Sequence, residues 1–247
     1  MTFSLDKSLS IGVIGLGGVA QAHLQAFELL DHVTIVSVCD VRAEAADSVS
    51  ARVGATAYTD YKQLLITGDI DLAMVLTPAS THREIVEAAA KQGIHVFCEK
   101  PIAITLEDAD AMVAACKQAK VKLFYGSCYR YLPAIIKAKQ LIQSGAIGEI
   151  QLMAEQLIGG HGKAGYVELP SIHYPLGGPG GPGMGLVDHG VHLMDVFAWL
   201  NDSEIVSAQG KGHVSGEAPS SEFMVMQLAN GAKGHLIYHA GTYSTEI

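Results

Sequence analysis

The chain has 247 residues, of which 49% are hydrophobic and 17% charged, and its formal charge is −9. This composition supports a packed core and excludes intrinsic disorder, and an acidic chain without runs of Lys or Arg argues against nucleic-acid binding. The four cysteines form no C-x-x-C pair, the N-terminus lacks a signal-peptide pattern, and no apolar run has membrane-spanning length, so we expect a cytoplasmic protein with reduced thiols and no membrane contact.

Residues 11–125 alternate short β-type runs with amphipathic helical stretches. The strand-like runs are Ser10–Gly15, Thr34–Cys39, Leu72–Leu76, His95–Cys98 and Lys122–Tyr125, and the helical stretches lie near 18–30, 42–52, 81–92 and 105–119. Thr81 and Thr105 each precede a carboxylate by three residues, as N-cap residues do. Because the strands are mostly apolar with little polar alternation, we expect a parallel sheet covered on both faces in a doubly wound α/β domain.

After Tyr125 the pattern changes to a helix, a strand, a second helix and three further strand-like runs. These elements lie near 133–144, 149–158, 186–200, 204–214, 222–229 and 232–240, with a glycine-rich loop at 159–185. Ser144-Gly145 is a typical helix end and Asn230-Gly231 a typical hairpin turn. We therefore predict a second, α+β domain over residues 128–247 with an open, mainly antiparallel sheet. Without a flexible linker between them, we expect this domain and the first one, residues 1–127, to be packed together.

The first strand is followed by a glycine-rich turn that fits the G-x-G-x-x-G/A pattern, Gly15-Leu16-Gly17-Gly18-Val19-Ala20. The pattern is informative here because it lies between an apolar strand and a helix. Gly15 permits the tight turn, Gly17 lets the backbone approach a pyrophosphate, and Ala20 lets the helix pack closely on the strand. The helix N-terminus supplies N–H groups to the phosphates, so residues 1–127 are predicted to form a Rossmann domain that binds NAD or NADP.

The second strand ends at Asp40, which is followed by Val41 and Arg42. Asp40 lies 23 residues after Gly17, where an acid that binds the ribose 2′-hydroxyl is expected. A 2′-phosphate at this position would meet like charge, which costs about 4 kcal/mol at 4 Å and an effective dielectric of 20. The sequence therefore favours NAD over NADP, with the alternative that Arg42 turns inward and binds a phosphate.

Glu99-Lys100-Pro101 follows the strand at His95–Cys98. Strand C-termini in such sheets face the cofactor crevice, so Lys100 is placed to contact a nicotinamide ribose or a substrate hydroxyl. Burial can lower the pKa of a lysine towards neutrality, which suits proton transfer. The alternative is a solvated Lys100 paired with Glu99.

The helix near 186–200 carries three polar residues on one side. At 100° per residue, Asp188, His192 and Asp195 share a stripe roughly 60° wide, and apolar residues occupy most other directions. Charges on a buried helix must be paired or line a site, and a histidine between two acids suits acid–base chemistry. The alternative is a helix cap with a structural His–Asp pair.

Metal binding is a competing interpretation, because Asp188, His189 and His192 are close in sequence. His189 lies about 60° round the helix from His192, and no H-E-x-x-H or C-x-x-C pattern occurs, so we predict no metal site. In the glycine-rich loop, His161 and Tyr166 are candidates for contact with a hydroxylated substrate, or belong to a polar surface.

Together these motifs resemble the Gfo/Idh/MocA family of NAD(P)-dependent sugar and polyol oxidoreductases. The matching segments are IGVIGLGGVAQAHLQAF at 11–27, VCDVR at 38–42, VLTPASTHREIVEAAAKQGIHVFCEKP at 75–101, YRYLPAIIKAKQLIQSGAIGEI at 129–150 and GMGLVDHGVHLMDVFAWL at 183–200. The EKP element and the D-x-x-x-H-x-x-D helix are the most specific of these. Family members usually continue past the hairpin that ends this chain, so the resemblance implies a shortened sheet with an exposed edge.

The resemblance implies a role for each matching residue. Lys100 would hold the nicotinamide ribose and the substrate together, His192 would be the general base, and Asp188 would bind a substrate hydroxyl and orient His192. Thr77, Pro78, His82 and Glu99 would line the cofactor crevice, with Tyr129 and Arg130 at the domain junction. The open sheet would pack against another subunit in a homodimer or homotetramer.

Three functions are compatible with the sequence. The first is an NAD-dependent dehydrogenase that acts on a secondary hydroxyl of a cyclic sugar, a polyol or a similar compound. The second is a redox-neutral glycoside hydrolase of the same fold that holds NAD tightly, and the third is a non-catalytic dinucleotide-binding protein.

Overall fold

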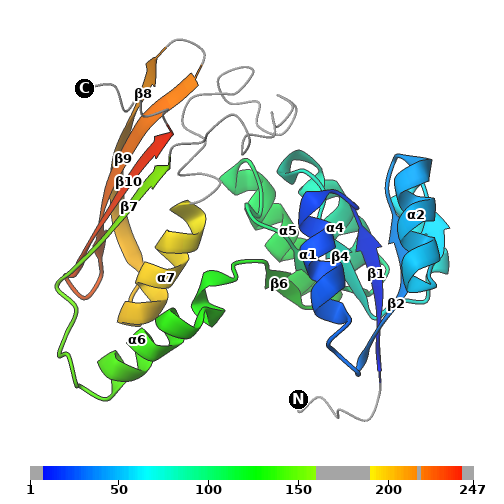
Figure 1. The fold of residues 1–247 in the computed structure, drawn as a ribbon, viewed down its shortest axis with the longest axis horizontal. Helices are drawn as coiled ribbons and strands as arrows, with labels where there is room; N and C mark the ends of the chain where they lie inside the picture. Colours follow the sequence, from blue (N-terminus) through cyan, green and yellow to red (C-terminus); the bar gives the residue numbers. More distant parts are fainter. Residues whose placement is uncertain (1–7, 160–189, 216–217, 241–247) are drawn as a thin grey trace. The chain divides into compact units, whose positions relative to one another are not determined.

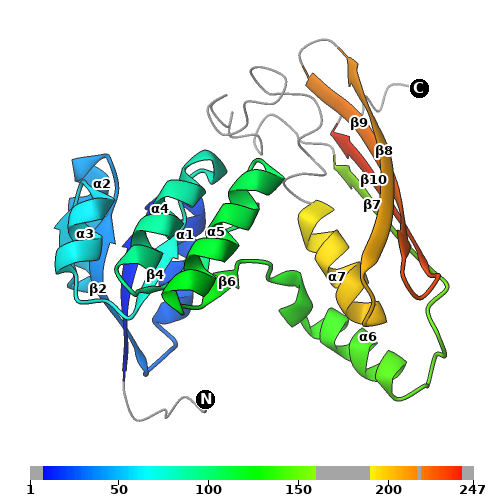
Figure 2. The same ribbon diagram turned by 180° about the vertical axis from the view of Figure 1, so that it is seen from behind.

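The computed structural model describes residues 8–159, 190–215 and 218–240, and the chain divides into two compact units, Met1–Gly126 and Ser127–Ile247 (Figures 1 and 2). We call these the N-terminal unit and the C-terminal unit. Within the described ranges, no helix combines the length and apolar character needed to cross a membrane. The four cysteines are free thiols, and Cys128 is exposed.

The N-terminal unit is built around a six-stranded parallel sheet with the strand order β3-β2-β1-β4-β5-β6. Its elements are β1 (Leu9–Ile14), α1 (Gly18–Phe27), β2 (Val33–Cys39), α2 (Ala43–Val53), β3 (Thr56–Tyr58), α3 (Tyr61–Thr67), β4 (Leu72–Val75), η1 (Ala79–Thr81), α4 (His82–Lys91), β5 (His95–Cys98), α5 (Leu106–Ala119) and β6 (Leu123–Tyr125). The strand order reverses between β1 and β4, which is where doubly wound sheets bind ligands. The predicted fold class of this unit is confirmed.

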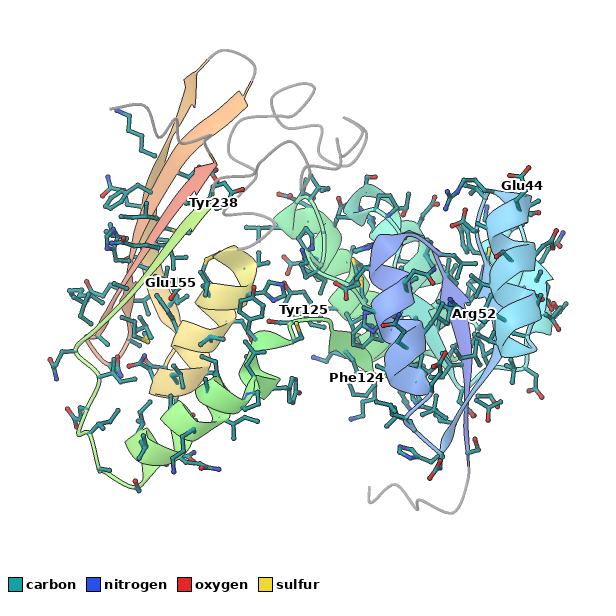
Figure 3. All side chains as sticks on the ribbon, in the orientation of Figure 1. Glu44, Arg52, Phe124, Tyr125, Glu155 and Tyr238 are labelled. Carbon is teal, nitrogen blue, oxygen red and sulfur yellow. The ribbon has the colours of Figure 1, made fainter. Side chains whose placement is uncertain are left out.

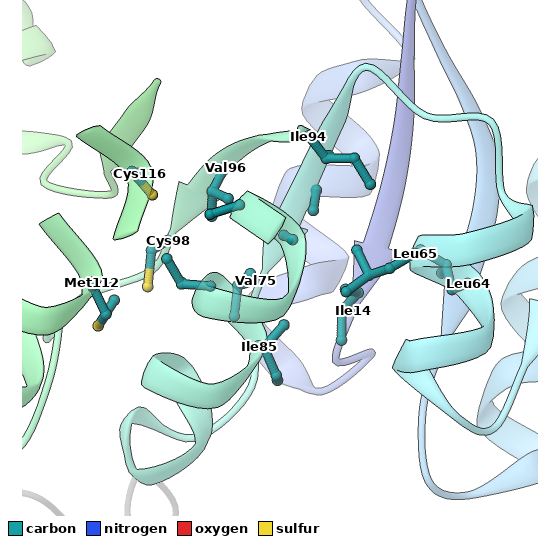
Figure 4. Close-up of a cluster of buried hydrophobic side chains, with 14 of the residues drawn as sticks. Ile14, Leu64, Leu65, Val75, Ile85, Ile94, Val96, Cys98, Met112 and Cys116 are labelled. Atoms are coloured by element: carbon teal, nitrogen blue, oxygen red, sulfur yellow. The ribbon is translucent and has the colours of Figure 1, made fainter. Parts of the chain in front are cut away.

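Two apolar layers cover the two faces of this sheet. Ile14 of β1 and Val75 of β4 point into a core with α3, α4 and α5, shown in Figure 4. Val13 and Met74, the neighbouring residues, point to the other face and pack with α1 and α2. Successive residues of a strand face opposite sides, so strands covered on both faces need the nearly continuous apolar runs seen in the sequence.

Two features of the N-terminal unit differ from the sequence prediction. The short strand β3 and the helix α3 were not predicted, because three residues of strand and seven of helix carry too little periodicity. The predicted cap at Thr81 is wrong: its hydroxyl lies 2.8 Å from the Pro78 carbonyl oxygen in the preceding 3-10 turn. The cap at Thr105 is confirmed, since its hydroxyl accepts the Asp108 N–H at 3.1 Å.

The C-terminal unit contains a four-stranded sheet with the order β7-β10-β9-β8. Its elements are η2 (Tyr129–Tyr131), α6 (Pro133–Gln143), β7 (Leu152–Gly159), α7 (Val191–Asn201), β8 (Ile205–Ser215), β9 (Ala218–Leu228) and β10 (Lys233–Ala240). The predicted hairpin at Asn230-Gly231 is confirmed, with Gly231 at a φ of 92°. The α+β class is also confirmed, but β7 pairs with β10 in parallel, so the sheet is mixed.

Helix α7 packs on one face of this sheet. Leu193, Val196 and Phe197 form a core with Met226, Leu228 and Leu236 of the strands. The far end of α7 is held by Lys139 of α6, whose Nζ lies 2.6 Å from the Trp199 carbonyl oxygen and 2.6 Å from Asp202 Oδ1. The last carbonyl groups of a helix have no partner within it, and a lysine there donates hydrogen bonds to them and interacts favourably with the negative end of the helix dipole. The helix that carries His192 is therefore anchored along its apolar face and at its C-terminus.

Candidate functional site

The turn between β1 and α1 uses its glycines in two different ways. Gly15 has a φ of 93°, and a Cβ at this position would lie 2.8 Å from main-chain atoms of Leu76 and Thr77. A Cβ at Gly17 or Gly18 would meet no atom within 4 Å. Gly17 caps α1 without a side-chain hydrogen bond, so the first N–H groups of the helix are accessible to an anion.

Two substitutions separate these roles. We expect Gly15→Ala to lower the free energy of unfolding by about 2 kcal/mol, because it combines a left-handed φ with a main-chain clash. Gly17→Ala, at a φ of −72° and with open space around it, should leave stability within about 0.5 kcal/mol and weaken NADH binding. Urea unfolding and NADH titration of both variants check this, and equal destabilisation by the two alanines would contradict it.

Asp40 lies at the end of β2, 9% exposed, and faces the same turn. Its Oδ2 accepts the Leu16 N–H at 3.0 Å, and its Oδ1 accepts the Arg42 main-chain N–H and Nε, each at 3.0 Å. Burial alone would raise the pKa of Asp40, but these hydrogen bonds and the Arg42 charge lower it below its ordinary value. Asp40 is therefore an ionised carboxylate, and the Arg42 guanidinium lies on it rather than turning towards a phosphate.

The loop after β4 is tied to the turn after β5 by His82. The ring of His82 is fully buried, with Nε2 2.8 Å from the Thr77 carbonyl oxygen and Nδ1 3.1 Å from that of Ile102. Both contacts are to main-chain oxygens, and a neutral ring donates its single N–H to one of them, so this histidine lies as a bridge between the two loops. The structure places Thr77 and Pro78 at the C-terminal end of β4, beside the Gly15 turn, and His82 beneath them.

The buried ring also predicts a pH dependence. Burial lowers the pKa of His82, and the carbonyl contacts only partly oppose that shift. A base with a lowered folded pKa contributes stability that is complete above its unfolded pKa of about 6.5 and is lost as the pH falls below it. The stability advantage of the parent over His82→Asn should therefore narrow between pH 7.5 and pH 5.5 in unfolding followed by circular dichroism; an equal gap at both would contradict it.

Glu99 and Lys100 form the turn after β5. The Glu99 carboxylate is nearly buried, and its Oε1 lies 2.9 Å from His23 Nε2, while its Oε2 accepts the Lys100 main-chain N–H at 2.8 Å. Burial would raise the pKa of Glu99, but the bond to His23 and the Lys100 amide lower it overall. Lys100 is half-buried. The histidine partner was not predicted, because no sequence pattern connects two residues 76 positions apart.

In the C-terminal unit, His192 lies in the first turn of α7 and is 4% exposed. Its ring stacks on the Tyr129 ring, with 4.2 Å between centroids and an interplanar angle of 7°. The predicted stripe of α7 is thus partly observed: His192 is buried against an aromatic ring, and Asp188 lies outside the described residues. His161 and Tyr166 also lie outside them.

Asp195 has partners other than a substrate. Its Oδ2 accepts Arg130 Nε at 2.6 Å and the Ser127 hydroxyl at 3.0 Å, and its Oδ1 pairs with Arg130 Nη2. This two-pronged ion pair raises the pKa of Arg130 and connects α7 to the segment that opens the C-terminal unit. Within that unit, the guanidinium of Arg130 is bound to Asp195. The predicted contact of Arg130 with the cofactor stays a proposal.

The sheet face that packs on α7 also carries polar residues that sequence patterns did not reveal. Glu155 of β7 and Tyr238 of β10 are labelled in Figure 3, and Glu222 of β9 is paired in register with Tyr238. Glu222 is 6% exposed. Leu236, which packs with α7, is paired with Glu155, so these polar groups lie on the α7 side of the sheet. Among the described residues, no group of three or more His, Cys, Asp or Glu is arranged to hold a metal.

Comparison with known proteins gives similarities over both units. The family model described as "Oxidoreductase family, NAD-binding Rossmann fold" matches residues 9–127, and that of the "GFO/IDH/MocA C-terminal domain" matches residues 135–246. The crystal structure of the WlbA dehydrogenase from Bordetella pertussis, in complex with NADH and UDP-GlcNAcA, superposes with a TM-score of 0.83 at 24% identity, covering 98% of this chain and 70% of that one.

The curated proteins that are similar in sequence include a dehydrogenase and a hydratase. Myo-inositol 2-dehydrogenase of Thermotoga maritima is 34% identical over 142 residues, 57% of this chain and 42% of that protein. The 2,7-anhydro-N-acetylneuraminate hydratase of Escherichia coli is 33% identical over 142 residues, 58% of this chain and 38% of that protein. The chain spans about half the length of the curated relatives that it matches. Since the two family models together match nearly all of its length, the chain belongs to the Gfo/Idh/MocA oxidoreductase family.

Proposed function

We propose that this chain acts in an NAD-dependent dehydrogenase that transfers a hydride between a secondary hydroxyl of a cyclic sugar or polyol and nicotinamide. Residues 1–127 bind the cofactor, and residues 128–247 bind the substrate and a second subunit. The observation that carries the proposal is the Gly15–Ala20 turn with Asp40 beside it, in a chain of an oxidoreductase family. The similarity to myo-inositol 2-dehydrogenase supports a polyol as substrate.

The residues present fit a dinucleotide. The open space at Gly17 and Gly18 and the uncapped start of α1 form a cradle for a pyrophosphate. The proposed cofactor-binding residues are Gly15, Gly17, Gly18, Val19, Ala20, Asp40, Val41, Arg42, Thr77, Pro78, His82, Glu99, Lys100 and Arg130. Of these, His82 acts through the Thr77 carbonyl that it holds, because its own ring is fully buried.

Asp40 supports NAD over NADP. Its carboxylate accepts hydrogen bonds from the Leu16 amide and from Arg42, which lower its pKa and keep it ionised. A 2′-phosphate placed beside it would therefore meet a negative charge. We expect Asp40→Ser to lower the Kd for NADPH relative to that for NADH by about tenfold, since it removes the charge and frees Arg42. The double variant with Arg42→Ala should lose that gain. Fluorescence titration with both cofactors measures the ratio, and an unchanged ratio in Asp40→Ser contradicts this role.

The chemistry proposed for the chain itself is proton transfer and substrate positioning. The bound nicotinamide supplies the hydride acceptor or donor. A ring nitrogen of His192 accepts the proton of the substrate hydroxyl, and stacking on Tyr129 fixes the plane of the imidazole. The Lys100 Nζ donates hydrogen bonds to the substrate hydroxyl oxygen, and Asp188 orients His192. Tyr129, His161, Tyr166 and Asp188 are the remaining proposed substrate contacts.

The proposed function is tested by cofactor binding followed by a polyol screen. Tight NADH binding with steady NADH formation from NAD and one polyol would support it. Loss of that turnover in Lys100→Met, with a much smaller change in NADH binding, would assign the turnover to this site. Absence of NADH and NADPH binding would overturn the proposal.

A redox-neutral reaction is the second candidate function. It is favoured by the similarity to a protein named as a hydratase, which implies no net oxidation. The same cofactor-binding residues would serve it, so only the product distinguishes the two candidates. Conversion of an anhydro-sugar or glycoside without accumulation of NADH would favour this candidate over the dehydrogenase.

The open face of the C-terminal sheet supports assembly with a second copy. Phe223 and Val225 are 44% and 40% exposed and alternate along β9 with Met224 and Met226, which pack towards α7. Leu152 of β7 is also exposed. Exposed apolar side chains on an open sheet face are typical of subunit interfaces, so we propose a homodimer or homotetramer, to be measured by light scattering.

A further inference from the structure

His23 connects two parts of the molecule that the proposed function uses: it lies on α1, which begins at the proposed phosphate cradle, and it contacts Glu99 in the turn after β5. It lies in the second turn of α1, and its ring meets the Phe97 ring of β5 edge-on, with 5.5 Å between centroids. Its side chain is 24% exposed. Since an ionised carboxylate only accepts hydrogen bonds, His23 Nε2 bears a hydrogen and donates a hydrogen bond to Glu99 Oε1.

Glu99 transmits this contact to the next residue. One carboxylate oxygen is bound by His23, and the other accepts the main-chain N–H of Lys100. The Glu99 N–H donates to the Val75 carbonyl oxygen at 3.0 Å, so the backbone of the turn is fixed on its other side. Gly126 also approaches closely, since a Cβ there would lie 3.1 Å from Glu99 Cα. On this fixed backbone, the nearly buried carboxylate must keep its rotamer to bind both donors.

We infer that His23 is a positioning residue that acts through Glu99 to hold the main chain of Lys100. Without the ring N–H, the carboxylate keeps one of its two donors in a nearly buried position, which favours its rotation towards solvent or its protonation. Either change weakens the bond to the Lys100 amide. The inference rests on the proposed function, which assigns the Lys100 amine to the reacting hydroxyl.

His23 lies on the same helix as the proposed phosphate cradle. The first turn of α1 forms the proposed phosphate cradle, and the second turn carries His23. One helix thus holds the dinucleotide and the turn that carries Lys100. The bond between Glu99 and the Lys100 amide should therefore be present both with and without bound dinucleotide.

The test compares His23→Ala with His23→Gln, whose amide restores an N–H donor at the end of the side chain. His32→Ala is the control, because His32 is an exposed histidine of the same unit. Exchange of the Lys100 amide proton is measured by NMR on the full chain, with and without NADH. We expect His23→Ala to speed this exchange about tenfold, His23→Gln to restore most of the protection, and His32→Ala to change nothing.

Kinetics separate positioning from a general structural role. On a polyol that the parent oxidises, His23→Ala should lower kcat about tenfold while the Kd for NADH changes less than about twofold. Unchanged exchange of the Lys100 amide in His23→Ala would overturn the inference. Loss of NADH binding together with kcat in the same variant would also overturn it, because that would indicate a general structural role. If the parent itself binds no NADH, the proposed function fails, and the amide exchange still decides whether His23 holds Lys100.

Discussion

His192→Asn should lower turnover by about 10²–10⁴-fold, the usual contribution of a positioned general base. His192 is buried at the start of α7 and stacks on Tyr129, so its ring has one defined orientation in which to accept a proton. Asparagine keeps a polar group of similar reach but cannot serve as a base near neutral pH. The proposed cofactor cradle lies in the N-terminal unit, so NADH binding should remain unchanged.

The matched control for this prediction is His235→Asn. His235 belongs to the same unit and also lies against an aromatic ring, that of Phe223. We expect its replacement to leave turnover within about threefold of the parent. Steady-state rates and NADH titration of both variants provide the measurement. Equal losses in the two variants would show that the effect at His192 reflects folding of the unit rather than proton transfer.

Asp195→Leu should lower the stability of the C-terminal unit by about 3 kcal/mol, because it leaves the Arg130 guanidinium without its carboxylate. The Asp195 side chain is 15% exposed and that of Arg130 is 39% exposed, so water offsets part of the loss. The double variant Asp195→Leu with Arg130→Met should recover much of the stability, since no charge then lacks a partner.

Trp199 makes this measurement specific. It is the single tryptophan of the sequence and lies in α7, so urea unfolding followed by its fluorescence reports on the C-terminal unit. A double variant less stable than Asp195→Leu would contradict the interpretation that an unpaired charge causes the loss. In that case the hydrogen bonds that Asp195 accepts from Ser127 and Arg130 would contribute more to stability than the pairing of opposite charges.

The sequence predicted the fold where long apolar runs were available. The strands at Thr34–Cys39, Leu72–Leu76 and His95–Cys98 were found within one residue of their observed bounds, because buried parallel strands are apolar on both faces. The parallel pairing of β7 with β10 was not predicted. Strand direction depends on the path of the chain between two strands, and local patterns do not contain it.

The candidate site was predictable only in part, for a similar reason. Asp40 followed from its spacing after Gly17, which the strand–turn–helix geometry dictates. The stripe on α7 predicted that Asp195 would flank His192, but the observed partners of Asp195 are Arg130 and Ser127. Such partners, like His23 for Glu99, are brought together by tertiary packing across 65 to 76 residues, and no periodic pattern encodes them.

The parallel pairing of β7 with β10 also sets the order in which the two units mature during synthesis. Strand β7 is followed by about 70 residues before its neighbour β10 begins. In the N-terminal unit, every strand pairs with at least one strand that is next to it in chain order, and the sheet is complete once β6 has left the ribosome. The nascent C-terminal unit, by contrast, presents β7 as an unpaired edge until β10 inserts between it and β9. Ribosome-bound chains that stop shortly before residue 233 should therefore be the ones that recruit chaperones.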